Sequence, residues 1–243
     1  MSLVRNIFKS SVGKKYLMAL TGLALFLFVV GHLIGNLQVF LGPDSLNSYA
    51  AFLKANPKFL WAARIGLLVV FLVHMYLAWA LSRENKKARP VQYYDKDAVT
   101  ASLSSRTMGI TGSVILVFVI FHLMHYTLFL INPEYKSLQD AHNRHDVYTM
   151  LIFGFSHWQI SLGYLLAVGL LSFHLSHGLQ SMFQSLGFKD RNYEAKIKLF
   201  SKVAAILLFL GYASIPIAVM VGVIKPMPVE KNVVTRKAYD TRF

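Results

Sequence analysis

The chain has 243 residues, of which 55% are hydrophobic, only 15% are charged and none is cysteine. Soluble domains carry about a quarter charged residues, so this composition indicates lipid as the surrounding solvent. The lack of cysteine excludes protein-ligated iron–sulfur clusters, c-type haem, thiol catalysis and disulfides. The net charge is +14, and the charged residues lie between apolar blocks. This distribution favours a membrane surface over nucleic acid as the partner of the basic residues.

Five apolar segments are long enough to cross a bilayer, which needs about 20 residues per helix. In chain order they cover residues 16–41, 59–81, 108–131, 148–186 and 203–224. All eleven carboxylates fall outside them, and no strand-like alternation is present. We therefore predict an all-α membrane protein, a bundle of five transmembrane helices in one domain over 1–243, with a polar tail at 225–243. Pro216 is expected to bend the last helix, and the connection 132–147 to form a surface loop or a short interfacial helix.

The lysines and arginines predict the orientation of these helices. Fifteen of them lie in the N-terminal segment and in the second and fourth connections, against four in the first and third connections. The positive-inside rule therefore places the N-terminus in the cytoplasm and the C-terminus outside.

Histidines inside the segments are the strongest functional signal, because polar groups at membrane depth are costly. Six fall there: His32, His74, His122, His125, His174 and His177. At a rise of about 1.5 Å per residue, His32 lies about 24 Å from the inner end of its helix, and His122 lies at nearly the same level. His74 and His174 both lie late in inward-running helices.

These four histidines form two depth-matched pairs from different helices. We call His32 and His122 the outer pair, and His74 and His174 the inner pair. A haem with two imidazole ligands needs two histidines on facing helices at one depth, and this chain supplies that arrangement twice. A zinc site would gather its ligands at one level. A single membrane histidine, by contrast, commonly serves as a hydrogen-bond partner between helices.

Three stretches around these histidines carry a family resemblance. They are GHLIGN at 31–36, RTM with Gly112 and FHL at 106–123, and FHLSHGLQS at 173–181. Over about residues 10–225 the chain resembles the di-haem cytochrome b membrane anchor of succinate:quinone and fumarate:quinone oxidoreductases, in the version with one large five-helix subunit (respiratory complex II).

That resemblance implies a function and partners. The outer pair would bind one haem b and the inner pair a second, and electrons would pass between an iron–sulfur subunit and quinone, with menaquinone favoured. A flavoprotein subunit with FAD would hold the succinate or fumarate site, so this chain would not be catalytic alone. We expect the chain in the bacterial inner membrane, in contact with lipid. The resemblance is also compatible with a higher oligomer of the whole complex.

Further residues are candidates for contacts with these groups. Arg64 and His177 are candidates to bind haem propionates, although Arg64 equally fits an interfacial side chain, and His125 fits packing. Glycines that would let a flat macrocycle approach are Gly31, Gly35, Gly169 and Gly178. Outer quinone candidates, which we favour, are Asn36, Gln38, Tyr126, His157 and Gln159; inner ones are Ser11, Arg106, His177 and Gln180.

Two other functions remain open at this point. One is the cytochrome b subunit of another quinone-linked enzyme, such as a hydrogenase or formate dehydrogenase. The other is a haem-free transporter that uses histidines as a proton relay. The chain also differs from relatives that carry a carboxylate two residues before the inner ligand of the fourth helix, since Ser172 stands there. A hydroxyl cannot store a proton near neutral pH.

Overall fold

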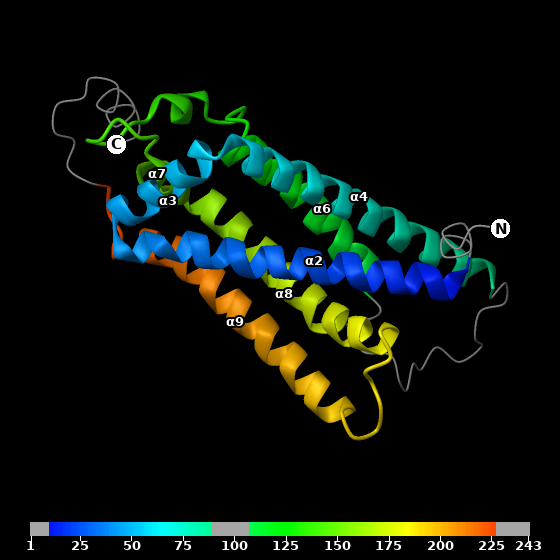
Figure 1. The fold of residues 1–243 in the computed structure, drawn as a ribbon. Coiled ribbons are helices and arrows are strands. Elements are labelled where there is room, and N and C mark those ends of the chain that lie inside the picture. Colours follow the sequence, from blue (N-terminus) through cyan, green and yellow to red (C-terminus); the bar gives the residue numbers. More distant parts are fainter. Residues whose placement is uncertain (1–9, 89–106, 227–243) are drawn as a thin grey trace. The chain divides into compact units, whose positions relative to one another are not determined.

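The computed structural model describes residues 10–88 and 107–226 (Figure 1). Within these ranges the chain is helical, and its one β-type pairing is an isolated bridge between Gln139 and His145. The elements are α2 (Ser11–Leu37), η1 (Gln38–Leu41), α3 (Pro43–Ala55), α4 (Pro57–Lys87), α6 (Met108–Tyr126), η2 (Pro133–Ser137), α7 (Val147–Ser156), α8 (Trp158–Ser185) and α9 (Glu194–Met220).

Five helices in the described residues are long and apolar enough to cross a membrane: α2 with η1, α4, α6, α8 and α9. This confirms the prediction of an all-α chain with five membrane-length helices. Helix α4 runs six residues beyond the predicted segment and so includes Glu84. That carboxylate forms an ion pair with Lys14 of α2, a largely buried lysine, and accepts a hydrogen bond of 3.0 Å from Ser11.

The chain divides into two compact units. The first contains the described residues of Met1–Val30, Trp61–Gly112 and Ser172–Leu207, and the second those of Gly31–Leu60, Ser113–Leu171 and Leu208–Phe243. Each unit has its own core. In the first, Ala19, Leu179 and Met182 are buried together. The inner pair lies in the first unit and the outer pair in the second.

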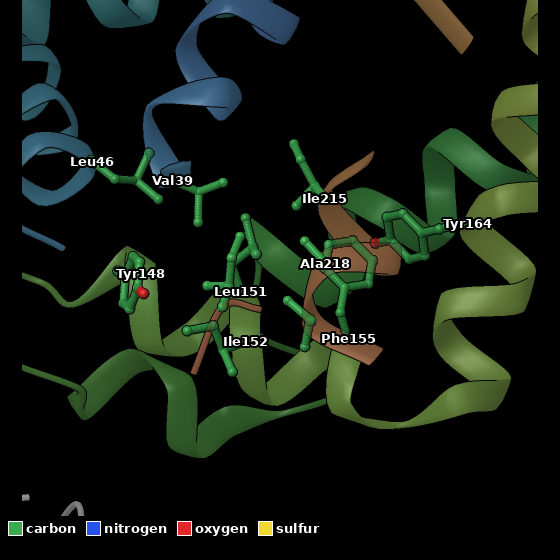
Figure 2. Close-up of a cluster of buried hydrophobic side chains, with 11 residues drawn as sticks. Val39, Leu46, Tyr148, Leu151, Ile152, Phe155, Tyr164, Ile215 and Ala218 are labelled. Carbon is green, nitrogen blue, oxygen red and sulfur yellow. The ribbon is translucent and has the colours of Figure 1, made fainter. Parts of the chain in front are cut away.

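The core of the second unit joins α3, α7, α8 and α9. Leu46 of α3, Leu151 of α7 and Ile215 of α9 belong to one buried cluster, which Figure 2 shows together with Tyr164 of α8. Helix α3 was not predicted from the sequence. The sequence nevertheless carries ordinary helix signals there. Pro43 is in the first turn, where proline is favoured. Asp44 in the first turn and Lys54 in the last turn each have the charge that the helix dipole favours at that end.

The predicted segment 148–186 is two helices. Helix α7 ends at Ser156, the next residue His157 has extended backbone angles (φ −83°, ψ 110°), and α8 begins at Trp158. The hydroxyl of Ser161, a fully buried residue, donates to the Phe155 carbonyl at 2.7 Å and so satisfies a backbone group that the break leaves without its helical partner. The break coincides with a short polar stretch of Ser156, His157 and Gln159 inside an otherwise apolar segment, a signal that the prediction of one continuous segment did not use.

The connection 132–147 is more buried than a surface loop. Tyr135 and Leu138 in it are almost completely buried and pack with Met150 and Phe153 of α7. Pro216 lies inside α9, which continues for four residues beyond it. A proline therefore interrupts one backbone hydrogen bond there without ending the helix.

A buried amide ties α3 to this connection. Asn47 is fully buried, and its Nδ2 donates to Asp140 at 3.2 Å and to Asp146 at 3.0 Å. Its Oδ1 accepts the backbone N–H of Tyr148 at 3.0 Å. Arg144 adds ion pairs with Asp140 and Asp44. Burial raises the pKa of the Asp140 carboxyl, but hydrogen bonds from Arg144, His142 and Asn47 outweigh this and lower its pKa overall.

Candidate functional site

The outer pair comes together in the second unit. His32 of α2 and His122 of α6 have ring centroids 5.9 Å apart, with planes at 85°. An imidazole nitrogen binds a transition metal at about 2.0–2.1 Å, so two imidazoles on opposite sides of one iron have centroids roughly 6 Å apart. The observed spacing therefore fits two histidines that share one metal.

Hydroxyl and aromatic groups surround the outer pair. The Tyr164 hydroxyl of α8 lies 3.3 Å from Nδ1 of His122, and it also lies 3.2 Å from Nδ1 of His125. His32 lies against Tyr212 of α9, with centroids 6.3 Å apart. His125 is fully buried and stacks on Tyr126 at 4.0 Å. This burial makes His125 a packing residue of the core.

The two histidines of the inner pair each lie next to a threonine hydroxyl. Nδ1 of His74 lies 3.1 Å from the Thr21 hydroxyl of α2, and Nδ1 of His174 lies 3.1 Å from the Thr111 hydroxyl of α6. These contacts come from four helices of the first unit: α2 and α4 for His74, and α6 and α8 for His174.

These contacts can be tested against what a haem needs. An axial histidine binds iron through one ring nitrogen, and the other nitrogen is normally held by a hydrogen bond. In His74, His174 and His122 the nitrogen with a hydroxyl partner is Nδ1. None of the four histidines of the two pairs is a fully buried residue. The outer pair therefore fits a bis-imidazole haem by its ring spacing, and the two inner histidines fit axial ligands by the hydroxyl partner at Nδ1 of each ring.

The glycines next to the rings differ from those that the sequence suggested. A Cβ atom built on Gly35 would lie 2.8 Å from the Tyr49 ring, so that glycine makes room for a tyrosine of α3. Gly169 faces Phe209, and a Cβ on Gly31 or Gly178 meets none of the described atoms within 4 Å. The glycines that face histidines are Gly22, at 3.4 Å from Cε1 of His74, and Gly112, at 3.6 Å from Cε1 of His174.

The two propionate candidates lie in other contacts. Arg64 is exposed on α4, and its guanidinium carbon lies 5.2 Å from the Trp61 ring centroid, a cation–π contact one turn away. His177 has its Nε2 atom 3.0 Å from the Ser181 hydroxyl on the same helix. Both remain candidates from sequence for a propionate.

The outer quinone candidates differ in exposure. Asn36 donates to the His32 carbonyl at 2.7 Å, and Gln38 accepts a bond from Ser45 at 3.1 Å. The Tyr126 hydroxyl is buried against Gly154, with no hydrogen-bond partner among the described residues. His157 and Gln159, at the break between α7 and α8, have exposed side chains.

The inner quinone candidates are mostly engaged within the protein. Ser11 bonds to Glu84, and the Gln180 amide donates to the Ser176 carbonyl at 2.8 Å. Arg106 lies outside the described residues. Ser172 has a buried hydroxyl with no hydrogen-bond partner in the described part of the chain.

Sequence reasoning missed Thr21, Thr111 and Tyr164. A signal for the two threonines existed, since each begins a Thr-Gly pair near the inner end of an apolar segment. The same depth arithmetic that paired the histidines would have placed these pairs near the inner histidines. Which helix face they occupy is not readable from hydropathy.

Comparison with known proteins gives one match. The family model for the succinate dehydrogenase/fumarate reductase transmembrane subunit matches residues 83–213, more than half of the chain. This range includes His122 and His174 but begins after His32 and His74. No curated protein and no solved structure matched the sequence.

Proposed function

Because this chain belongs to the family of succinate dehydrogenase/fumarate reductase transmembrane subunits, we propose that it holds two haem b groups in the membrane and connects an iron–sulfur partner subunit with quinone. When bound, each haem supplies a one-electron couple between those two partners. Family membership makes the chain part of an enzyme complex. The succinate or fumarate site then belongs to a partner flavoprotein with FAD.

The observation that carries the proposal is the pairing of the four histidines. The outer pair has the centroid spacing that one shared iron requires. Each inner histidine has its Nδ1 atom against a threonine hydroxyl, so that Nε2 remains as the ligand atom. A proton relay would need no such matched pairing of rings across helices. The chain's own contribution is thus to orient four imidazoles and to surround them with apolar side chains.

The proposal includes an orientation in the membrane. With the N-terminus in the cytoplasm, the inner pair belongs to the half of the membrane nearer the soluble partner subunits. The basic connections would then offer those subunits an electrostatic docking surface. We place this chain in a bacterial inner membrane, with its C-terminus outside.

For quinone we favour the outer side, and within it His157 and Gln159. A quinone needs an apolar slot and donors to its two carbonyls. Both side chains are exposed at the start of α8, whereas the Tyr126 hydroxyl is buried against Gly154. Replacement of His157 and Gln159 with Ala should weaken inhibition by a quinone analogue without changing the haem content. Unchanged inhibition would move the quinone site elsewhere.

The test of the haem proposal is a reduced-minus-oxidised spectrum of the purified full-length protein with each ligand replaced by Ala. His32→Ala and His122→Ala should deplete one b-type species, and His74→Ala and His174→Ala should deplete the other. His142→Ala, an exposed connection residue, is the matched control and should retain both. Depletion of the same species by His32→Ala and His74→Ala would contradict the pairing.

The same spectrum separates the alternative functions. A protein without any b-type band would be the haem-free relay. Co-purification with a flavoprotein and an iron–sulfur protein that together oxidise succinate or reduce fumarate supports the family's complex. Co-purification with a hydrogenase or formate dehydrogenase would favour the other class of quinone-linked cytochrome b.

A further inference from the structure

The two histidines of the inner pair have nearly the same immediate surroundings, although they lie on different helices. His74 of α4 faces Thr21 and Gly22 of α2, while His174 of α8 faces Thr111 and Gly112 of α6. Both threonine hydroxyls lie 3.1 Å from Nδ1. Thr111 is itself buried. One arrangement of a hydroxyl and a glycine is thus built twice, once for each ring.

The hydrogen bonds of the threonines determine which way each imidazole bond runs. The Thr21 hydroxyl lies 2.8 Å from the Leu17 carbonyl oxygen, one turn earlier in its own helix. The Thr111 hydroxyl lies 3.1 Å from the corresponding carbonyl of Thr107. A hydroxyl has one hydrogen, and in a helix it commonly donates it to this carbonyl. Its oxygen is then left to accept a hydrogen bond from the ring.

That direction selects one tautomer of each histidine. When Nδ1–H donates to the threonine oxygen, Nε2 carries no hydrogen and presents a lone pair. Only this tautomer of a neutral imidazole can bind iron through Nε2. The opposite direction would place the hydrogen on Nε2 and block the ligand position. The threonines therefore hold both rings in the form that binds a metal.

The glycines limit the position of the same rings. A Cβ on Gly22 would lie 3.4 Å from Cε1 of His74, and one on Gly112 would lie 3.6 Å from Cε1 of His174. Side chains larger than alanine would therefore displace the imidazoles. Each ring is held by a hydrogen bond at Nδ1 and by close backbone beside Cε1.

The outer pair is held differently. The single Tyr164 hydroxyl reaches both His122 and the buried His125. Since it has one hydrogen, it can donate to only one of these two rings. The outer site therefore depends on a phenol shared by two histidines, and a change at Thr21 or Thr111 leaves it intact. The outer haem then serves as an internal reference.

We propose that Thr21 and Thr111 are positioning residues that fix the tautomer and orientation of His74 and His174 for haem binding. This inference rests on the proposed function. It assigns a separate hydroxyl to each ligand of one haem. The loss of either hydroxyl should weaken retention of the inner haem, and should raise its reduction potential, because an imidazole without this bond donates less electron density to iron.

The experiment compares Thr21→Val and Thr111→Val, which keep the shape but lose the hydroxyl, with Thr21→Ser and Thr111→Ser, which keep it. The purified full-length protein, loaded with haem, is mixed with excess apomyoglobin, and haem loss is followed spectrally. Loss of a bond to a ligating histidine typically lowers metal affinity about 10- to 100-fold, and we expect the Val variants to lose the inner haem faster than the wild type by about this factor. The Ser variants should behave like the wild type, and the outer haem should be unaffected throughout. A redox titration measures the potential of the inner haem in the same samples.

Ser201→Ala is the matched control. Ser201 is a fully buried hydroxyl of the first unit that donates to the Ile197 carbonyl at 2.8 Å, as the threonines do to their own helices. Its removal should change neither haem. If a Val variant does not assemble, Thr→Ala and Thr→Ser at that position are compared. Faster loss in Ala alone supports the inference, and equal rates overturn it.

The outcomes separate the two proposals. A wild-type protein without b-type haem refutes the proposed function. A wild-type protein with two haems whose inner haem has the same retention and potential in the Val and Ser variants refutes only the positioning role. Equal acceleration in Ser201→Ala would also refute it, because loss of any buried hydroxyl would then be sufficient.

Discussion

Replacement of Asn47 with Leu tests whether one amide holds the α3 helix in place. The change removes two hydrogen bonds to carboxylates, at 3.2 and 3.0 Å, and leaves the Tyr148 N–H without its acceptor. Bonds to charged groups contribute about 1.5–3 kcal/mol each, and a buried unsatisfied donor costs about 1–3 kcal/mol. Both carboxylates keep other partners, so the low ends of these ranges apply. We expect the free energy of unfolding to fall by about 4 kcal/mol.

Thermal unfolding of the purified protein measures the change, which corresponds to a decrease in Tm of roughly 10 °C for a chain of this length. Hydrogen exchange should locate the effect in α3 and at the start of α7. Asn192→Leu is the control, since that asparagine is exposed and its replacement should cost less than about 0.5 kcal/mol. A Tm for Asn47→Leu equal to that of the control, with unchanged protection of α3, would refute the reasoning.

Three further predictions concern other parts of the molecule. Gly154→Leu should lower the free energy of unfolding by about 1–3 kcal/mol, because the leucine side chain would overlap the Tyr126 ring. The control Gly163→Ala, on an open face of α8, should leave the free energy of unfolding unchanged. Thermal unfolding measures both variants. The pKa of Asp140 is lower in the folded state than its unfolded value of about 3.9. The ionised carboxylate should therefore stabilise the fold fully above about pH 5. This stabilisation should be lost as the pH falls below the unfolded pKa toward the lower folded pKa. A plot of Tm against pH for Asp140→Asn should lack that part of the acid dependence, and an unchanged profile would contradict it. Because Ser172 cannot store a proton, succinate oxidation by the complex with menaquinone should be electrogenic. In sealed vesicles whose potential is followed with a voltage-sensitive dye, turnover should slow when the membrane potential is collapsed, and electroneutral turnover at full rate would contradict this.

The sequence allowed prediction of features that depend on length along a helix. Hydropathy identified the five membrane-length helices, because a bilayer sets their minimum length. The rise per residue also assigned His32 to the level of His122, and their rings lie 5.9 Å apart in the structure. Both inferences need only the position of a residue along its own axis. Neither requires knowledge of what the neighbouring helix presents.

Features that depend on the rotation of helices were not predictable. Gly35 was expected near a macrocycle but packs on Tyr49, while Gly22 and Gly112 face histidines. Which side of a helix faces a neighbour cannot be inferred when nearly every residue is apolar. The buried amide of Asn47 was missed for a related reason, since its partners are about a hundred residues away in sequence.

The break at His157 has a consequence for biogenesis. Helix α7 has ten residues, about 15 Å at the usual rise, which is half of the hydrocarbon thickness. Eight consecutive residues of α7 are buried, and its core partners include residues of α3 and α9. Partitioning from the translocon into lipid therefore does not determine the final position of α7, because protein covers its apolar surface. Synthesis must reach α9 before α7 can acquire its final surroundings, so this subunit needs a folding step after its spans have inserted.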